Sequence, residues 1–341
     1  MIIAILLVMF NIFLLIFPQN VLAAARDGLL LWFNNVLPSL LPFMIVTNML
    51  VMLGFAELLA RFLAPFMRRF FNLPGAAGFG LVTGLTSGYP MGAKTVSDLY
   101  REKQLNTRQA QHLLAFCNNA GPLFILGAVG VGMFNSTRIG YILWISHVLG
   151  AFAVGFLLKP KDDSMYAREE KRENSLSNAH SIGKMLGEAV RNSMDSITVI
   201  GGLIIFFSVV ISVFDVLGLP SDTVFGGVVG GLVEVTSGAR RIATLTPSVI
   251  TLAAAAFVVA FGGFSVHAQT FHFVAGTGIR VRGYLLAKLL HGVIAACICA
   301  LIWILLADIG ERASLAPAAD VFEKSGRACI NTDVFHSHMQ M

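Results

Sequence analysis

The stretch "GFGLVTGLTSGYPMGAKT", residues 78–95, decides the fold of this chain. It carries glycine at 80, 84, 88 and 92, a spacing of four that puts these residues on one face of a helix. Glycines on one face allow backbones to approach closely inside a membrane. Pro90 then removes a backbone donor and pushes Tyr89 out of helical geometry, so the stretch predicts a helix that breaks near residues 88–90.

The rest of the chain has the composition of a membrane protein. Its 341 residues are 56% hydrophobic and 13% charged, with a mean hydropathy of +0.76, whereas soluble domains carry about 25% charged residues. A helix needs roughly 20 apolar residues to cross a bilayer. The stretches that approach this length include 39–55, 110–134, 137–158, 193–218 and 283–307. The composition therefore predicts an all-α polytopic protein in a lipid bilayer.

The net charge of +5 does not indicate a nucleic-acid partner, because the Lys and Arg residues lie between the apolar spans, where membrane topology places them. Residues 1–25 are expected to form an N-terminal transmembrane helix. The alanines at 23–25 also resemble a signal-peptide cleavage site, but no positive charge precedes the apolar run, so a retained helix is favoured.

A long polar stretch, 159–192, divides the chain into two halves with the same order of features. Each half contains a glycine-rich segment with "TSG", at 86–88 and 236–238. An apolar segment with a polar interruption follows, "FCNNAGP" at 116–122 and "FGGFSVHAQ" at 261–269. We therefore expect a first repeat over 26–158, a cytoplasmic linker, a second repeat over 193–307, and a poorly ordered polar tail over 308–341.

The second repeat is predicted to be inverted in the membrane. Three crossings per half is an odd number, and inversion leaves most Lys and Arg residues on the cytoplasmic side, with Arg138, Arg240 and Arg241 as exceptions. Segments 76–100 and 223–246 are predicted to be re-entrant hairpins. Inverted repeats with broken helices are typical of secondary transporters.

The polar side chains on these hairpins and interruptions are the candidate site. Thr86 and Ser87 adjoin the predicted break, Lys94 adds positive charge, and Glu234 is an intramembrane carboxylate, which indicates function by default. The predicted substrate-binding residues are Thr86, Ser87, Lys94, Asn118, Asn119, Glu234, Thr236, Ser237, Ser265, His267 and Gln269.

Each of these residues also has a structural interpretation. The glycines could form a packing seam alone, with Lys94 reaching towards the surface. The asparagines could satisfy the backbone of a broken helix, and Glu234 could pair with Arg240 or Arg241.

No catalytic or metal-binding pattern is present, so we expect no enzyme activity, no cofactor and no metal. "GYPMGAKT" lacks the spacing of a P-loop, and neither G-x-S-x-G nor H-E-x-x-H occurs. The four cysteines form no metal or redox pattern. His147, Lys288 and His291 lie near helix ends or on single faces, and we assign them structural roles.

The segments "GLVTGLTSGYPMGAK", "FCNNAGPLFI" and "GLVEVTSG" resemble the YlbJ family of sporulation integral membrane proteins, also called stage V sporulation protein V. The resemblance covers residues 26–307, and its first-half motifs are the more specific. The family belongs to the nucleoside-recognition, or gate, domain group. That group is similar in plan to concentrative nucleoside transporters, whose inverted repeats carry re-entrant hairpins around a central substrate site.

The resemblance implies a protein of endospore-forming bacteria, located in the outer forespore membrane and moving dipicolinic acid towards the spore. Dipicolinate is a small, flat, aromatic dianion. Helix ends and Lys94 suit an anion, but Glu234 would repel one unless it is protonated or paired with Arg240. A nucleoside carrier and a non-transport scaffold for spore assembly remain alternatives. Assembly with further copies of the chain, or with other sporulation membrane proteins, is compatible with the sequence.

Overall fold

The computed structural model describes residues 1–160, 182–218, 220 and 222–315, and every regular element in these ranges is a helix. Most of the predicted linker, residues 161–181, and the tail from residue 316 lie outside the described residues. The chain divides into two compact units, Met1–Ala300 and Leu301–Met341, and the second is described as helix up to Leu315. All contacts discussed below lie within the first unit.

The chain begins with a series of short helices. They are α1 (Ile2–Ile16), α2 (Pro18–Leu31), η1 (Trp32–Val36), α3 (Leu37–Met52), α4 (Phe55–Phe66) and η2 (Met67–Phe71). The apolar helices on either side of Phe17 are bent by 102° relative to each other. Pro18 begins α2, where its missing N–H costs no intrahelical hydrogen bond. Residues 1–25 are therefore split between two helices.

The quoted stretch forms a helical hairpin, as predicted. Its helices are α5 (Ala77–Thr86) and α6 (Met91–Arg101). The break falls at Ser87–Pro90, where Gly88 adopts a φ of 84°, a conformation that glycine tolerates better than any other residue. The hairpin is followed by α7 (Thr107–Cys117), η3 (Leu123–Met133) and α8 (Thr137–Leu157).

The second half repeats this order. After α9 (Ile182–Val216) come α10 (Val224–Val233), α11 (Val235–Ala243), α12 (Val249–Phe261), α13 (Gly263–Val274) and α14 (Val281–Leu315). Glu234 alone separates α10 from α11. Gly262 and Gly263, with φ of 92° and 73°, separate α12 from α13. Each half thus contains a hairpin followed by a broken helix.

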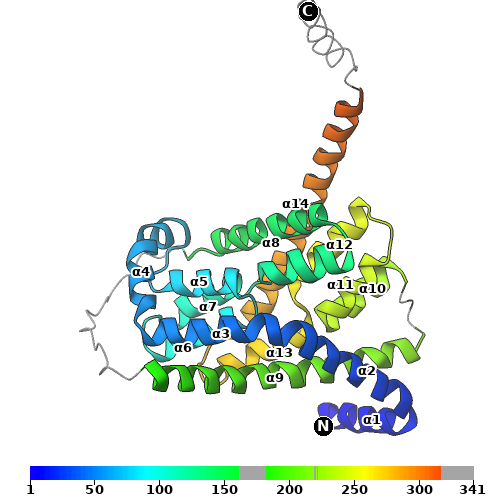
Figure 1. Cartoon of the computed structure of the whole chain (residues 1–341), viewed down its shortest axis with the longest axis horizontal. Helices are drawn as coiled ribbons and strands as arrows, with labels where there is room; N and C mark the ends of the chain where they lie inside the picture. The colour runs from blue at the N-terminus through cyan, green and yellow to red at the C-terminus, as the bar shows by residue number, and fades with distance from the viewer. Residues whose placement is uncertain (161–181, 219, 221, 316–341) are drawn as a thin grey trace, which may run out of the picture. The chain divides into compact units, whose positions relative to one another are not determined.

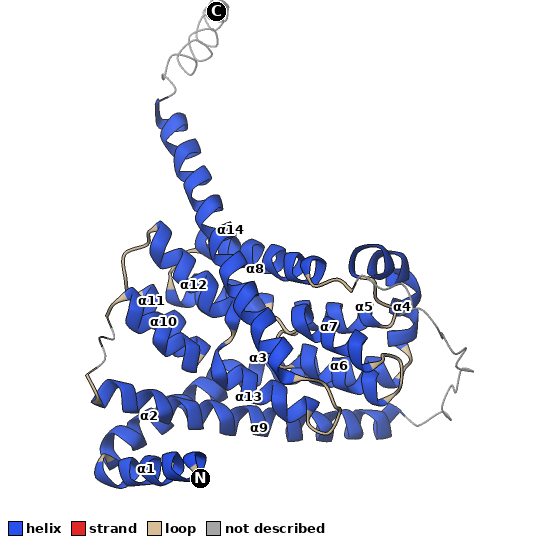
Figure 2. Cartoon of the chain, turned by 180° about the vertical axis from the view of Figure 1, so that it is seen from behind, coloured by secondary structure: helices blue, strands red, loops and turns tan. Residues whose placement is uncertain are grey.

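The packing of these elements repeats as well. In each half the two hairpin helices contact each other and the helix before the break: α5, α6 and α7 in one, and α10, α11 and α12 in the other. Across the halves, α6 contacts α13 and α11 contacts η3, which are equivalent pairs (Figures 1 and 2). α3 and α9 pack side by side, next to α6 and α13 (Figure 1).

Among the described residues, four helical segments are long and apolar enough to cross a membrane: Thr137–Leu157, Ile182–Val216, Val249–Val274 and Val281–Leu306. The bent pair formed by α1 and α2 would add a fifth. Large apolar side chains are exposed on these segments, among them Phe156, Phe206 and Leu289, as expected for surfaces that face lipid. The predicted class, a polytopic all-α membrane protein with broken helices, is confirmed. The predicted inversion of the second half is an orientation in the bilayer and stays a prediction.

A large apolar cluster joins the two halves. Buried side chains of α5, α6 and α7, such as Leu81, Val96 and Phe116, form one cluster with Val274 and Tyr284 of the second half. The buried polar residues described next lie at the edge of this cluster, where the broken helices meet.

Candidate functional site

The first hairpin lies directly against the first broken helix. A Cβ built on Gly84 would overlap with the carbonyl oxygen of Cys117, and one on Gly92 would lie 2.6 Å from the same oxygen. A Cβ on Gly88 would collide with the backbone N of Gly121. The glycine face therefore packs closely against the backbone, as the glycine spacing indicates, and it brings the tip of the hairpin to the break at Asn118–Pro122.

The second hairpin meets the second break in the same way. A Cβ on Gly238 would overlap with the backbone of Gly231, and one on Gly231 would overlap with the side chain of Val258 in α12. A Cβ on Gly263 would lie 2.7 Å from the carbonyl oxygen of Gly231 and 3.4 Å from Cα of Glu234. The tip of each hairpin is thus held against backbone that has left helical geometry.

Glu234 caps its own hairpin helix. Its carboxylate accepts hydrogen bonds from the backbone N of Thr236, at 3.0 Å, and of Ser237, at 2.7 Å. Arg241, one of the two arginines considered as a partner of Glu234, pairs instead with Asp215 at the end of α9. The carboxylate of Glu234, only 2% exposed, is therefore stabilised by two N–H groups and the positive end of α11.

Asn118 joins the two halves. Its Nδ2 donates to Thr270 Oγ1, at 2.8 Å, and to the Tyr284 hydroxyl, at 2.9 Å. Its Oδ1 accepts from the backbone N of Ala93 in the first hairpin, at 3.3 Å. His267 Nδ1 lies 3.2 Å from the same Tyr284 hydroxyl. The structure thus brings two predicted site residues, Asn118 and His267, onto one shared partner.

Asn119 lies beside Asn118 and is also fully buried. Its Nδ2 donates to the carbonyl oxygen of Phe116, at 2.8 Å, while its Oδ1 has no partner among the described residues. The Tyr89 hydroxyl and His267 Nε2 likewise have none in the described part of the chain. The Tyr89 ring lies 3.8 Å from the position of a Cβ on Gly262, so the first hairpin reaches the second break.

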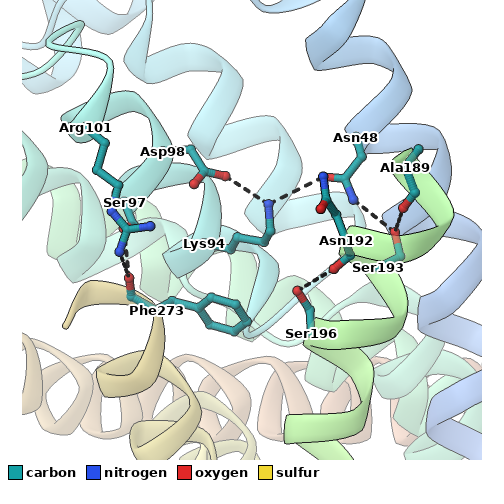
Figure 3. A network of polar contacts seen from close by, with 10 residues as sticks. All are labelled: Asn48, Lys94, Ser97, Asp98, Arg101, Ala189, Asn192, Ser193, Ser196 and Phe273. Carbon is teal, nitrogen blue, oxygen red and sulfur yellow. Dashed lines mark hydrogen bonds and ion pairs between the residues drawn. The ribbon is translucent and has the colours of Figure 1, made fainter. Parts of the chain in front are cut away.

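Lys94 lies apart from this cluster, on the side of α6 that faces α3. Its Nζ contacts Asp98 Oδ2, at 2.9 Å, and Asn48 Oδ1, at 3.4 Å, and Asn48 in turn donates to Ser193 Oγ of α9 (Figure 3). Two residues bind α6 to the end of α13: Ser97 Oγ donates to the carbonyl oxygen of Phe273, which Arg101 also contacts (Figure 3).

The remaining predicted residues are spread around the two tips. Thr86 is exposed and donates to the carbonyl oxygen of Val82, and Ser87 is buried at the first break. Thr236 is buried and Ser237 half-buried on the first turn of α11. Ser265 and Gln269 are buried on α13. Within the described ranges, no group of three or more His, Cys, Asp or Glu side chains could hold a metal ion.

Sequence reasoning missed the charged residue at the centre of the cluster. Lys288 is fully buried, and its Nζ donates to the carbonyl oxygen of Asn118, at 2.9 Å. His291 Nδ1 lies 2.9 Å from the same Nζ, and His291 Nε2 lies 2.8 Å from the carbonyl oxygen of His147. A lysine inside an apolar helix was the available signal. Its position on a single helix face indicated a structural role, and the sequence does not show its contact with Asn118, 170 residues away.

Comparison with known proteins places these features in a family. A family profile described as "Gate: Nucleoside recognition" matches residues 33–137, which include the first hairpin and the first broken helix. The chain is 34% identical over 319 residues to the sporulation integral membrane protein YlbJ of Bacillus subtilis (strain 168). The alignment covers 84% of this chain and 78% of that relative. No solved structure matches. The chain therefore belongs to the family of the sporulation integral membrane protein YlbJ.

Proposed function

We propose that this protein carries a small anionic solute, dipicolinic acid, across the outer forespore membrane during endospore formation. The observation that carries the proposal is the meeting of two helical hairpins and two broken helices at a buried polar cluster. In secondary transporters, broken helices of this kind surround the substrate near the middle of the membrane. The proposed contacts are the polar residues predicted from the sequence, except Lys94, which lies apart from the cluster. Asn119, Glu234 and His267 are at their centre.

The polar groups at the breaks favour an anion. The N-cap residues of η3 and α13 are Pro122 and Gly262, and neither helix has a side-chain cap. Each therefore presents N–H groups at the positive end of a helix, where anions bind. Glu234 is the negative group nearest the second break, and the two N–H donors at the positive end of α11 partly offset its charge.

The cluster is closed in this structure. Asn118, Asn119 and His267 have no exposed surface, so a solute reaches them only when the hairpins move away from the broken helices. Such movement of one repeat against the other is the usual form of alternating access. The glycine-packed contacts of both hairpins are suited to it, because they consist of backbone surfaces rather than interlocked side chains.

A nucleoside is the second candidate solute, and the match to the "Nucleoside recognition" profile favours it. Nucleosides carry a ribose and no carboxylate, so the two candidates differ in charge. The amide of Asn119 and the imidazole of His267 could bind either one. A scaffold for spore assembly is the remaining alternative, in which the polar cluster only holds the helices together.

Equilibrium binding to the purified protein in nanodiscs tests the proposal. We expect saturable binding of dipicolinate by the wild type, weakened by Asn119→Ala and by Glu234→Gln. The matched control is Asn11→Ala, because Asn11 is exposed on α1 and bonds only within its own helix. Competition by uridine and adenosine identifies a nucleoside carrier. Wild-type protein that is folded but binds neither class of solute would favour the scaffold.

A further inference from the structure

Lys288 is the one lysine among the described residues that is fully buried. It lies on α14, and its ammonium contacts two acceptors, the Asn118 carbonyl oxygen and His291 Nδ1, each at 2.9 Å. No carboxylate of the described residues lies within 4.0 Å of its Nζ. An ammonium has three N–H donors, so one donor and the whole charge lack a partner in this part of the chain.

The hydrogen bonds around Lys288 determine which nitrogens carry protons. The backbone N of Ala120 donates to His147 Nε2, at 3.0 Å, so the proton of a neutral His147 is on Nδ1. The carbonyl oxygen of His147 accepts from His291 Nε2, which leaves His291 Nδ1 to accept from Lys288. His147 Nδ1–H is then a second buried donor that has no partner among the described residues.

The structural alternative is that Lys288 only caps the first broken helix. α7 ends at Cys117, and the Asn118 carbonyl oxygen lies at its negative end, where a cation is favourable. That contact explains the position of the ammonium but does not neutralise its charge. A charge inside a membrane protein is costly, and it is normally paired with an opposite charge or marks a substrate pathway.

We propose that Lys288 is the specificity-determining residue of the site, and that its ammonium pairs with a carboxylate of the solute. The inference rests on the proposed function, because it needs an anionic solute to reach the cluster. The position of Lys288 allows this. Its Nζ donates to the carbonyl oxygen of Asn118, at the break that the first hairpin covers, and Asn119 is the next residue. The site should therefore select a carboxylate over a neutral molecule of the same shape.

A pair of ligands separates charge from shape. Dipicolinate and its neutral analogue pyridine-2,6-dicarboxamide have the same ring and planar substituents. The diamide lacks the two negative charges, and an NH2 donor replaces one oxygen of each carboxylate. Their dissociation constants would be measured by calorimetry on the full chain in nanodiscs, for the wild type, Lys288→Met and Lys288→Arg. Lys159→Met is the matched control, since Lys159 bonds to the carbonyl oxygen of Arg69 at a partly exposed site.

We expect Lys288→Met to weaken dipicolinate binding by roughly 30-fold or more, the usual effect of removing one partner of a buried charge pair. Binding of the diamide should change by less than about threefold, because that complex contains no charge pair to lose. Lys288→Arg, which keeps the charge, should retain more dipicolinate binding than Lys288→Met. Lys159→Met should bind both ligands as the wild type does.

Three results would overturn the inference. Wild-type affinity for dipicolinate in Lys288→Met would show that the charge is not used. An equal loss of both ligands in Lys288→Met and Lys288→Arg, with unchanged thermal stability, would show that the residue acts by shape alone. Failure of the wild type to bind dipicolinate would refute the proposed function itself, and it is distinguished from the other two because it needs no variant.

Discussion

At the scale of single residues, the glycines of the first hairpin determine how closely it packs. Gly84 has no room for a Cβ, because the carbonyl oxygen of Cys117 occupies that position. This contact is between backbone atoms, so neither side can turn aside as a flexible side chain would. The glycine spacing in the sequence therefore indicates that α5 packs at backbone contact distance against the end of α7.

Gly84→Ala should lower the stability of the protein by about 1–3 kcal/mol, the typical cost of overpacking a buried contact. Gly202→Ala is the control: Gly202 lies in α9, and a Cβ there meets no neighbouring atom within 4 Å in the described part of the chain. Alanine should be neutral or slightly stabilising at that position. Thermal unfolding in detergent compares the two variants, and equal midpoints would contradict the packing seam.

Glu234 should contribute to stability as well as to the proposed site. Glu234→Ala removes the acceptor for two backbone N–H groups and should cost about 1–2 kcal/mol, as the loss of a helix cap does. Glu234→Gln keeps one acceptor oxygen and should cost less. Unfolding by heat in detergent would measure both, and an alanine variant as stable as the wild type would argue that the cap is not needed.

At the scale of elements, the breaks were predictable and the cluster between them was only partly so. Glycine and proline act on their own backbone, so "TSGYP" and "NNAGP" show where a helix ends without knowledge of the fold. Lys94 was assigned to the site, yet it contacts Asp98 one turn along α6, and the four-residue spacing of that pair is visible in "KTVSD". Lys288 was missed because the carbonyl oxygen that its ammonium contacts, that of Asn118, comes from the other half of the chain.

The two halves should be energetically coupled through Asn118 and Tyr284. These residues share a hydrogen bond of 2.9 Å across the halves. A double-mutant cycle with Asn118→Ala and Tyr284→Phe should give a coupling energy of about 0.5–3 kcal/mol, as for residues in one hydrogen-bond network. Unfolding of the four proteins provides the values. Strict additivity would mean that the halves are held together elsewhere.

At the scale of the whole molecule, the repeated order of hairpin and broken helix gives the protein two similar units that meet at a polar centre. The exposed apolar faces of α8, α9 and α14 place this centre inside a membrane protein. The centre contains a buried lysine, two asparagines and three histidines. Burying such residues in a membrane protein costs stability, and they normally mark a substrate pathway. Their presence at the meeting point of the breaks is therefore the main reason to propose transport rather than a scaffold.

Uptake of labelled dipicolinate by proteoliposomes tests this central claim most directly, because it measures movement across a membrane and not binding alone. The account predicts saturable uptake by the wild type above that of empty liposomes, competed by unlabelled dipicolinate and strongly reduced by Lys288→Met. Lys159→Met should transport as the wild type does. Uptake by correctly folded wild-type protein that does not exceed the empty liposomes would contradict the account.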